Sequence, residues 1–238
     1  MPGRFHELSI ATPDIRASIE FYEGLGFWQA SAGDAWRHPY GVVTDGRLVL
    51  GLHETPDASA LTFIHPDLAA AAATLSDGGV PLTRRQTDPE AFNEIEFADP
   101  AGHRVRFVAA RTYSPAALTQ GEGSQLGRFA HYSMPARDLA AVAAFWEPQG
   151  FVLMPEEEDP YPHHSLVSDG IAMALHAPRL LPEPALVFCD EDMGSRIGRL
   201  RDSGVEVESS LPRGLAPQAN ALLEAPEGTL LLMLTGTL

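Results

Sequence analysis

The sequence is poor in cysteine and in positive charge. Its one cysteine, Cys189, cannot form an internal disulfide, and no Cys-x-x-Cys motif indicates a zinc ribbon or a redox pair. We therefore interpret Cys189 as a core residue. Acidic residues outnumber basic ones by 32 to 16, and the net charge of −16 includes no Lys/Arg cluster that would attract a polyanion. We accordingly expect no nucleic acid partner.

Long apolar runs are also absent. The chain has no run of about 18 apolar residues, which a membrane helix needs, and residues 1–6 lack the features of a signal peptide. We expect a cytoplasmic protein with no membrane segment. Its hydrophobic content of 45% over 238 residues is enough for a folded core. The acidic run at residues 156–159 predicts a solvated loop, because consecutive carboxylates do not converge on one cation.

What the chain does contain is an internal repeat of about 110 residues. Residues 5–27 recur as residues 129–151 at a constant offset of 124, which matches Asp14 to Asp138 and Phe21-Tyr22 to Phe145-Trp146. Later segments match at offsets of 125 and 126, as in residues 60–63 with 185–188 and 100–102 with 226–228. The sequence therefore predicts a first domain at 1–111, a linker at 112–126 and a second domain at 127–238.

Each copy divides into two modules of similar pattern. In the first module, an alternating strand at 5–10 precedes a helix that Asp14 caps and Gly24 and Gly26 end, and short strands follow near 27–31, 36–44 and 47–53. The second module repeats this order, with a strand at 60–64, a helix near 67–78 and strands near 81–86, 93–98 and 103–108. Because one module leaves a sheet face uncovered, modules must pair. Four βαβββ modules predict an α+β fold with two open mixed-sheet barrels.

Residues 14–27 read Asp-x-x-x-Ser-Ile-x-Phe-Tyr-x-x-Leu-Gly-Phe. This sequence pattern resembles the first-helix signature of the vicinal oxygen chelate superfamily, which includes glyoxalase I, bleomycin-resistance proteins and extradiol dioxygenases. The resemblance covers all four modules and is strongest in the first. It implies glyoxalase-like barrels and a divalent metal such as Fe, Mn, Ni or Zn at a barrel mouth. The family's ligands are His, Gln or Glu on the first strand of a module and Glu on its last strand.

Most of these ligand positions fall on residues that cannot bind a metal. The first-strand positions are Glu7, Ala60, His131 and Ala185, and the last-strand positions lie near Leu50, Arg106, Met173 or Ala174, and Leu232. Each copy thus keeps one possible ligand, whereas a catalytic cation needs about three. We therefore expect no metal cofactor. The hypothesis for the first copy is an ion pair between Glu7 and Arg106 in its place, and the alternative is two independent surface charges.

The histidines offer a second kind of site. His131 is the candidate acid or base, and a relocated metal site would combine it with His163 or His164. His53 and His176 occupy the same place in the repeat, which favours a shared structural role. His38 and His103 fall in turns or at strand edges, where a solvated or hydrogen-bonded histidine is typical.

The sequence favours a protein that binds a small organic molecule in a barrel cavity without a metal, as bleomycin-resistance proteins do. Glu7, Arg106, His164, Trp36 and Tyr40 are the expected ligand-binding residues, and His131 the expected catalytic one. The alternative is a glyoxalase- or dioxygenase-like enzyme with a relocated divalent metal. An acidic interaction module ranks last. Either a monomer or a homodimer is compatible with four modules in one chain.

Overall fold

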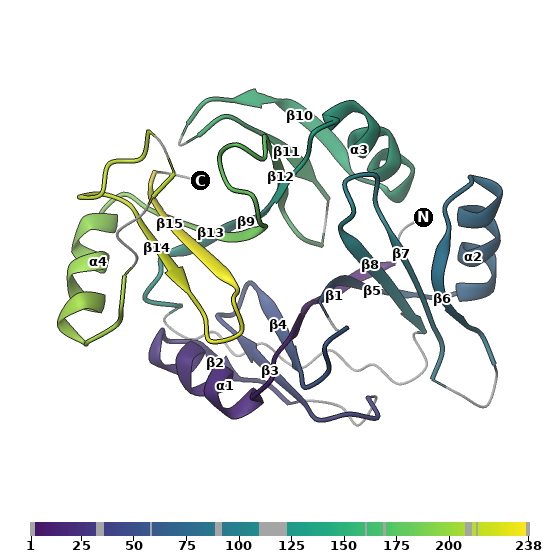
Figure 1. Ribbon diagram of the computed structural model, residues 1–238, viewed down its shortest axis with the longest axis horizontal. Helices are drawn as coiled ribbons and strands as arrows, with labels where there is room; N and C mark the ends of the chain where they lie inside the picture. The colour runs from purple at the N-terminus through teal and green to yellow at the C-terminus, as the bar shows by residue number, and fades with distance from the viewer. Residues whose placement is uncertain are drawn as a thin grey trace.

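The structure, a computed structural model, describes residues 3–31, 36–57, 59–88, 92–109, 123–159, 161–168, 170–207, 211–212 and 214–236. These residues form four α-helices and two mixed β-sheets, one of eight strands and one of seven (Figure 1). The strands of the first sheet come from residues 4–109 and those of the second from residues 128–235. Each sheet has two end strands and is therefore open. The predicted α+β fold with open mixed sheets is confirmed.

The first half consists of two βαβββ modules. The first module contains β1 (Arg4–Ala11), α1 (Ile15–Gly24), β2 (Trp28–Gln29), β3 (Tyr40–Thr44) and β4 (Val49–His53). The second contains β5 (Ala60–His65), α2 (Leu68–Asp77), β6 (Leu82–Gln86), β7 (Glu94–Ala98) and β8 (Arg104–Ala109). The strand order is β2-β3-β4-β1-β5-β8-β7-β6, so the two modules meet where β1 pairs with β5. The strand expected at 36–44 begins at Tyr40, and residues 32–35 lie outside the described part of the chain.

The second half repeats this plan. Its third module contains β9 (Arg128–Pro135), α3 (Leu139–Trp146), a 3-10 turn (Glu147–Gln149), β10 (Val152–Glu157), β11 (His163–Val167) and β12 (Met173–His176). The fourth contains β13 (Ala185–Asp190), α4 (Met193–Asp202), β14 (Ala221–Glu224) and β15 (Leu230–Thr235). The strand order β10-β11-β12-β9-β13-β15-β14 is that of the first sheet with one end strand fewer among the described residues.

The aspartates that the repeat preserves start the helices. The side chain of Asp14 accepts a hydrogen bond of 3.0 Å from the backbone N–H of Ala17, and Asp138 does the same for Ala141 at 3.0 Å. Each bond satisfies a backbone donor that has no partner within the first helical turn. Beyond the helices, Gly26 and Gly150 have φ angles of 88° and 85°, a region that glycine enters without steric cost.

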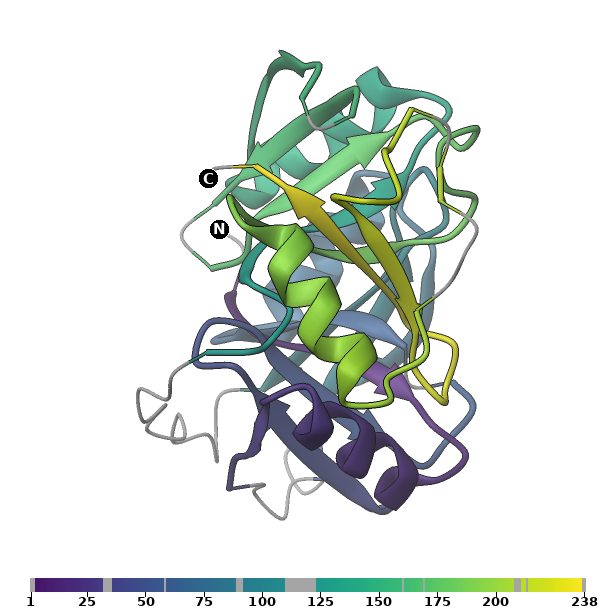
Figure 2. The same ribbon diagram turned by 90° about the vertical axis from the view of Figure 1, so that its left-hand side faces the viewer.

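The two halves share one hydrophobic core. Figure 2 shows the later half of the chain, in green and yellow, above the earlier half, in purple and blue. The ring of Phe27 lies 6.3 Å from that of Phe188, and Phe63 lies 6.2 Å from Trp146. Buried residues of both halves belong to the same cluster. One face of each sheet therefore packs into the interface between the halves.

Polar contacts across this interface follow the repeat. On α1, Tyr22 donates a hydrogen bond of 2.7 Å to Glu227, which lies in the last turn of the second half. On α3, the indole of Trp146 donates one of 3.2 Å to Asp99, beside the equivalent turn of the first half. Tyr22 and Trp146 are repeat equivalents, so the duplication supplies the same kind of contact twice. Figure 1 shows α1 beside the β14–β15 hairpin and α3 beside the β7–β8 hairpin.

The structure also places the single cysteine, the acidic run and part of the predicted linker. Cys189 is buried, as predicted. The acidic run was expected in a loop, but Glu156 and Glu157 end the edge strand β10, whose side chains are all exposed. Most of the predicted linker lies outside the described residues; within its described end, Leu126 is buried in the shared core. None of the helices in the described segments is long and apolar enough to cross a bilayer.

Candidate functional site

The first sheet has one apolar face and one charged face. Leu8, Leu61 and Phe107 point into the shared core. Because side chains alternate along a strand, their neighbours Glu7, Thr62 and Arg106 point to the other face. Pairing places Glu7 beside Thr62 and Thr62 beside Arg106, and all three side chains are buried. The sheet thus carries a row of buried polar groups on the side away from the core.

Glu7 is the centre of a hydrogen-bond cluster at the middle of the sheet. Its carboxylate accepts hydrogen bonds from Ser9 at 2.7 Å, from His53 at 2.8 Å and from the hydroxyl of Tyr40. Burial raises the pKa of this carboxyl, but the His53 hydrogen bond and the neighbouring His6 and His53 outweigh burial, and the pKa falls to about 2. The structure therefore holds a fully buried carboxylate anion.

The carboxylate of Glu7 lies over Gly51. A Cβ at Gly51 would overlap the Glu7 carboxylate group, so any side chain at this position would have to displace that carboxylate. The family's last-strand position was expected near Leu50. That expectation is wrong by one residue: Leu50 is in the core, and Gly51 and His53 are the β4 residues on the Glu7 side.

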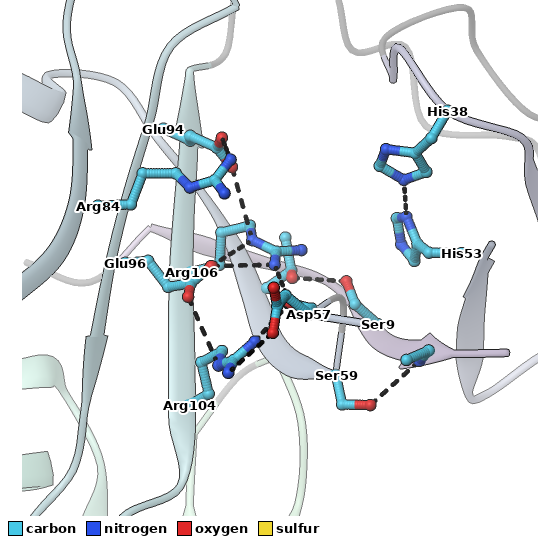
Figure 3. A network of polar contacts seen from close by, with 12 residues as sticks. Ser9, His38, His53, Asp57, Ser59, Arg84, Glu94, Glu96, Arg104 and Arg106 are labelled. Carbon is cyan, nitrogen blue, oxygen red and sulfur yellow. Dashed lines mark hydrogen bonds and ion pairs between the residues drawn. The ribbon is translucent and has the colours of Figure 1, made fainter. Parts of the chain in front are cut away.

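His53 connects Glu7 to a second histidine. Its Nδ1 lies 2.8 Å from Nε2 of His38, on the chain segment that leads into β3. His53 is fully buried, whereas His38 is half-buried. Burial and the adjacent His53 and Arg106 lower the pKa of His38, although Glu94 and Glu7 oppose the shift. Figure 3 shows the His38–His53 pair facing a cluster of arginines and glutamates.

That cluster is formed by β6, β7 and β8. The guanidinium of Arg106 lies 3.0 Å from Glu96 and 3.6 Å from Glu94, and Arg84 lies 2.8 Å from Glu94. Cross-strand pairing of Glu96 with Arg106 explains the contact. The predicted ion pair between Glu7 and Arg106 is therefore corrected. Among the ion pairs of the described residues, Glu7 has histidine partners and Arg106 has the glutamates of β7.

A cavity of about 220 Å³ lies between these two groups of residues. The ring of Trp36 packs 4.8 Å from Phe92 and 4.9 Å from His53, and the guanidinium carbon of Arg106 lies 5.5 Å from its centroid. The lining residues are Trp36, Arg37, His38, Thr55, Asp57, Arg84, Gln86, Phe92, Glu94 and Arg106. Aromatic faces and both signs of charge thus meet in one small space.

In the second half, Tyr161 occupies the space that corresponds to the cavity of the first half. The strand register makes His131 the equivalent of Glu7 and His164 the equivalent of Gly41, and Tyr161 and His38 each lie three residues before that second pair. The buried hydroxyl of Tyr161 lies 2.6 Å from Nε2 of His131 and donates to Ser133 at 2.9 Å. Burial, with His163 and His176 nearby, lowers the pKa of His131 to about 3. This histidine is therefore neutral and already hydrogen-bonded.

The predicted site residues thus separate into two places. In the first half, Trp36 and Arg106 line the cavity, whereas Tyr40 and Glu7 are hydrogen-bonded to each other outside its lining. His131 and His164 lie in the second half, where His163 is the β11 residue beside His131, with their rings 5.0 Å apart. His164 points to the opposite face of β11 and has Nδ1 3.3 Å from the carbonyl of Met154.

The donors present do not fit the family's divalent metal. In the described part of the chain, no three His, Cys, Asp or Glu side chains are grouped so as to hold an ion. Both oxygens of Glu7 already accept hydrogen bonds, Gly51 and Ala60 offer no donor atom, and Arg106 adds a positive charge. A cation at this place would lack ligands and would be repelled by the guanidinium.

His38, His53 and Gly51 were not singled out from the sequence as site residues. The Asp45-Gly46 signal predicts the hairpin but not its register: β3 and β4 pair around a four-residue loop, with Thr44 opposite Val49, and this register sets Tyr40 opposite His53. No comparable local signal identifies His38, because the segment before β3 has no regular pattern.

Known proteins share this fold. Residues 4–107 match the model of the Glyoxalase/Bleomycin resistance protein/Dioxygenase superfamily. A search of curated protein sequences gave no match. Among solved structures, a catechol 2,3-dioxygenase is 14% identical with a TM-score of 0.61, over 98% of this chain and 87% of its own. The 2,3-dioxygenase LapB from Pseudomonas sp. KL28 is 16% identical with a TM-score of 0.63, over 100% and 94%.

A third structure of this kind is the homoprotocatechuate 2,3-dioxygenase from Arthrobacter globiformis, which is 18% identical with a TM-score of 0.63, over 99% of this chain and 80% of its own. At such identities the likeness establishes the fold alone. Residues 4–107 are thus similar to the Glyoxalase/Bleomycin resistance protein/Dioxygenase superfamily, and the chain over its whole length shares the fold of these 2,3-dioxygenase structures.

Proposed function

We propose that the cavity of the first half binds a small, planar, polar organic molecule without the help of a divalent metal. The observation that carries this proposal is the cavity of about 220 Å³ in which Trp36 and Phe92 lie beside the buried charges of Arg106 and Glu94. Ligand sites combine apolar or aromatic walls with a few converging polar groups in this way.

The size and charge of the cavity limit the ligand. Drug-sized molecules occupy pockets of roughly 300–1,000 Å³, so a cavity of about 220 Å³ fits a smaller molecule, on the order of ten to fifteen non-hydrogen atoms. Trp36 and Phe92 favour a flat ring or a conjugated system. The lining carries slightly more positive than negative charge, with three arginines (Arg37, Arg84 and Arg106) against two carboxylates (Asp57 and Glu94). A ligand with at least one oxygen acceptor matches this lining.

A thermal-shift screen of small aromatic and polar fragments, followed by titration of the hits, tests the proposal. Trp36→Ala should weaken binding at least about tenfold. Trp28→Ala is the matched control, because Trp28 is a half-buried tryptophan of the same module whose ring lies over Gly46 and not against the cavity. Equal loss of binding in both variants, or no fragment that stabilises the wild type, would contradict the proposal.

The alternative, a glyoxalase- or dioxygenase-like enzyme with a relocated metal, makes a different prediction. Titration with Ni, Mn, Fe or Zn would then raise the melting temperature, and the purified protein would contain a stoichiometric ion. Our proposal predicts neither effect. The saturated carboxylate of Glu7 and the positive charge of Arg106 support this expectation.

A further inference from the structure

Three side chains form a line from the buried centre of the first sheet to the cavity. Oε1 of Glu7 lies 2.8 Å from Nε2 of His53, and Nδ1 of His53 lies 2.8 Å from Nε2 of His38. Glu7 and His53 are fully buried, while His38 lines the cavity. The line begins at an anion and ends at an imidazole that a bound molecule can reach.

The charge of Glu7 fixes the direction of each hydrogen bond when both rings are neutral. A carboxylate anion only accepts, so Nε2 of His53 carries the proton of that bond. The Nδ1 of His53 is then an acceptor, and Nε2 of His38 must donate to it. This leaves a lone pair on Nδ1 of His38. Figure 3 shows this second ring nitrogen turned toward the side of the cavity where Glu94 and Arg106 lie.

We propose that His38 accepts a proton from an acidic group of the molecule bound in the cavity, while His53 and Glu7 hold His38 in the accepting tautomer and balance its positive charge. This inference rests on the proposed function, because it needs a bound molecule. It adds proton transfer to binding and assigns it to a residue outside the family's metal-ligand positions.

The step needs no further reactant. An O–H bond of the bound molecule breaks, an N–H bond forms at Nδ1 of His38, and the electron pair stays on the ligand oxygen. The imidazolium donates through Nε2 to His53, which donates to Glu7. The charged groups that bear on His38 are Arg106 on β8, Glu94 on β7 and Glu7 on β1, and the adjacent titratable ring is His53 on β4. Arg106 favours the anion that forms on the ligand, and Glu7 favours the cation on His38.

The second half offers a comparison within the same chain. Tyr161 stands in the place of His38, and His131 stands in the place of Glu7. A tyrosine hydroxyl is a poor proton acceptor, and a neutral histidine cannot balance a cation as a carboxylate does. The proton-accepting line is thus a feature of the first half.

The test uses 4-nitrophenol, a flat molecule of suitable size whose colour reports loss of its proton. Bound to the wild-type protein, it should ionise about one pH unit below its free value, a tenfold change. Bound to His38→Gln, it should ionise as it does in water. His65→Gln is the control, because His65 is outside the cavity lining. Binding is followed separately by the NMR signal of the Trp36 indole.

Each outcome decides the inference. If 4-nitrophenol binds but ionises at the same pH as in water, His38 does not accept its proton. The same conclusion follows if the ionisation pH shifts equally in wild type and in His38→Gln. Either result overturns the proton-accepting role and leaves the proposed function standing. Absence of binding by this probe also overturns the inference, while the fragment screen judges the proposed function independently. A second measurement needs no ligand: in Glu7→Gln the NMR titration midpoint of His38 should fall, because the anion behind it is gone. An unmoved midpoint in a folded Glu7→Gln protein would contradict the relay.

Discussion

The carboxylate of Glu7 occupies the space that a side chain at Gly51 would need. We predict that Gly51→Ala lowers the free energy of unfolding by about 1–3 kcal/mol, the usual cost of overpacking a buried site. In a Glu7→Ala background the new methyl group has room, so the same substitution should cost much less. Urea unfolding of the two single variants and the double variant measures the difference.

Gly24→Ala is the matched control for this substitution. A Cβ at Gly24, in the last turn of α1, would meet nothing within 4 Å, so the variant should be neutral or slightly stabilised. If Gly51→Ala lowers the free energy of unfolding equally with and without Glu7, the carboxylate is not the reason why glycine is needed at position 51.

Tyr22 ties the two halves together through Glu227. Tyr22→Phe removes the hydroxyl that donates a hydrogen bond of 2.7 Å to the Glu227 carboxylate. This variant should lower the free energy of unfolding by about 1.5–3 kcal/mol, the range for hydrogen bonds to charged groups. Combined with Glu227→Ala, the losses should be less than additive, because both substitutions remove the same contact. Additive losses in chemical unfolding would show that the two residues act independently.

His131 should make the protein less stable as the pH falls. Its pKa of about 3 in the folded protein lies below the ordinary histidine value of 6.5, so the unfolded chain takes up a proton first and unfolding is favoured between these two values. His131→Gln removes this effect. The slope of unfolding free energy against pH should decrease by up to about 1.4 kcal/mol per pH unit in that window. If the slope of unfolding free energy against pH is the same in wild type and variant, His131 takes up its proton equally well in the folded protein, and the account of its lowered pKa is wrong.

The sequence predicts the scaffold well because its signals are local. Asp14 and Asp138 cap helices from within one turn, and Gly26 and Gly150 permit the chain to reverse after them. The repeat preserves these features, and so the module order follows from them. The domain boundaries at 111 and 126 stay predictions, since residues 110–122 lie outside the described part of the chain.

The site was predicted only in part because its contacts depend on register. Glu7 and Arg106 do share a sheet face, as expected, but among the described residues the carboxylate nearest to Arg106 is that of its cross-strand neighbour Glu96. Leu50, near which a ligand position was expected, lies on the core face of β4, since successive strand residues alternate. The shared place of His53 and His176 in the repeat favours a shared structural role, but His53 is hydrogen-bonded to the carboxylate of Glu7 and His176 to the hydroxyl of Ser133.

The central claim is that an organic molecule binds in the first-half cavity without a metal. The chain has three tryptophans, and only Trp36 lines that cavity, whereas Trp146 is buried between the halves. The indole N–H signals of protein treated with EDTA should therefore be recorded during titration with the best fragment. We predict a saturable shift of the Trp36 signal and an unmoved Trp146 signal. A shift that requires an added divalent ion, or one confined to Trp146, would contradict the claim.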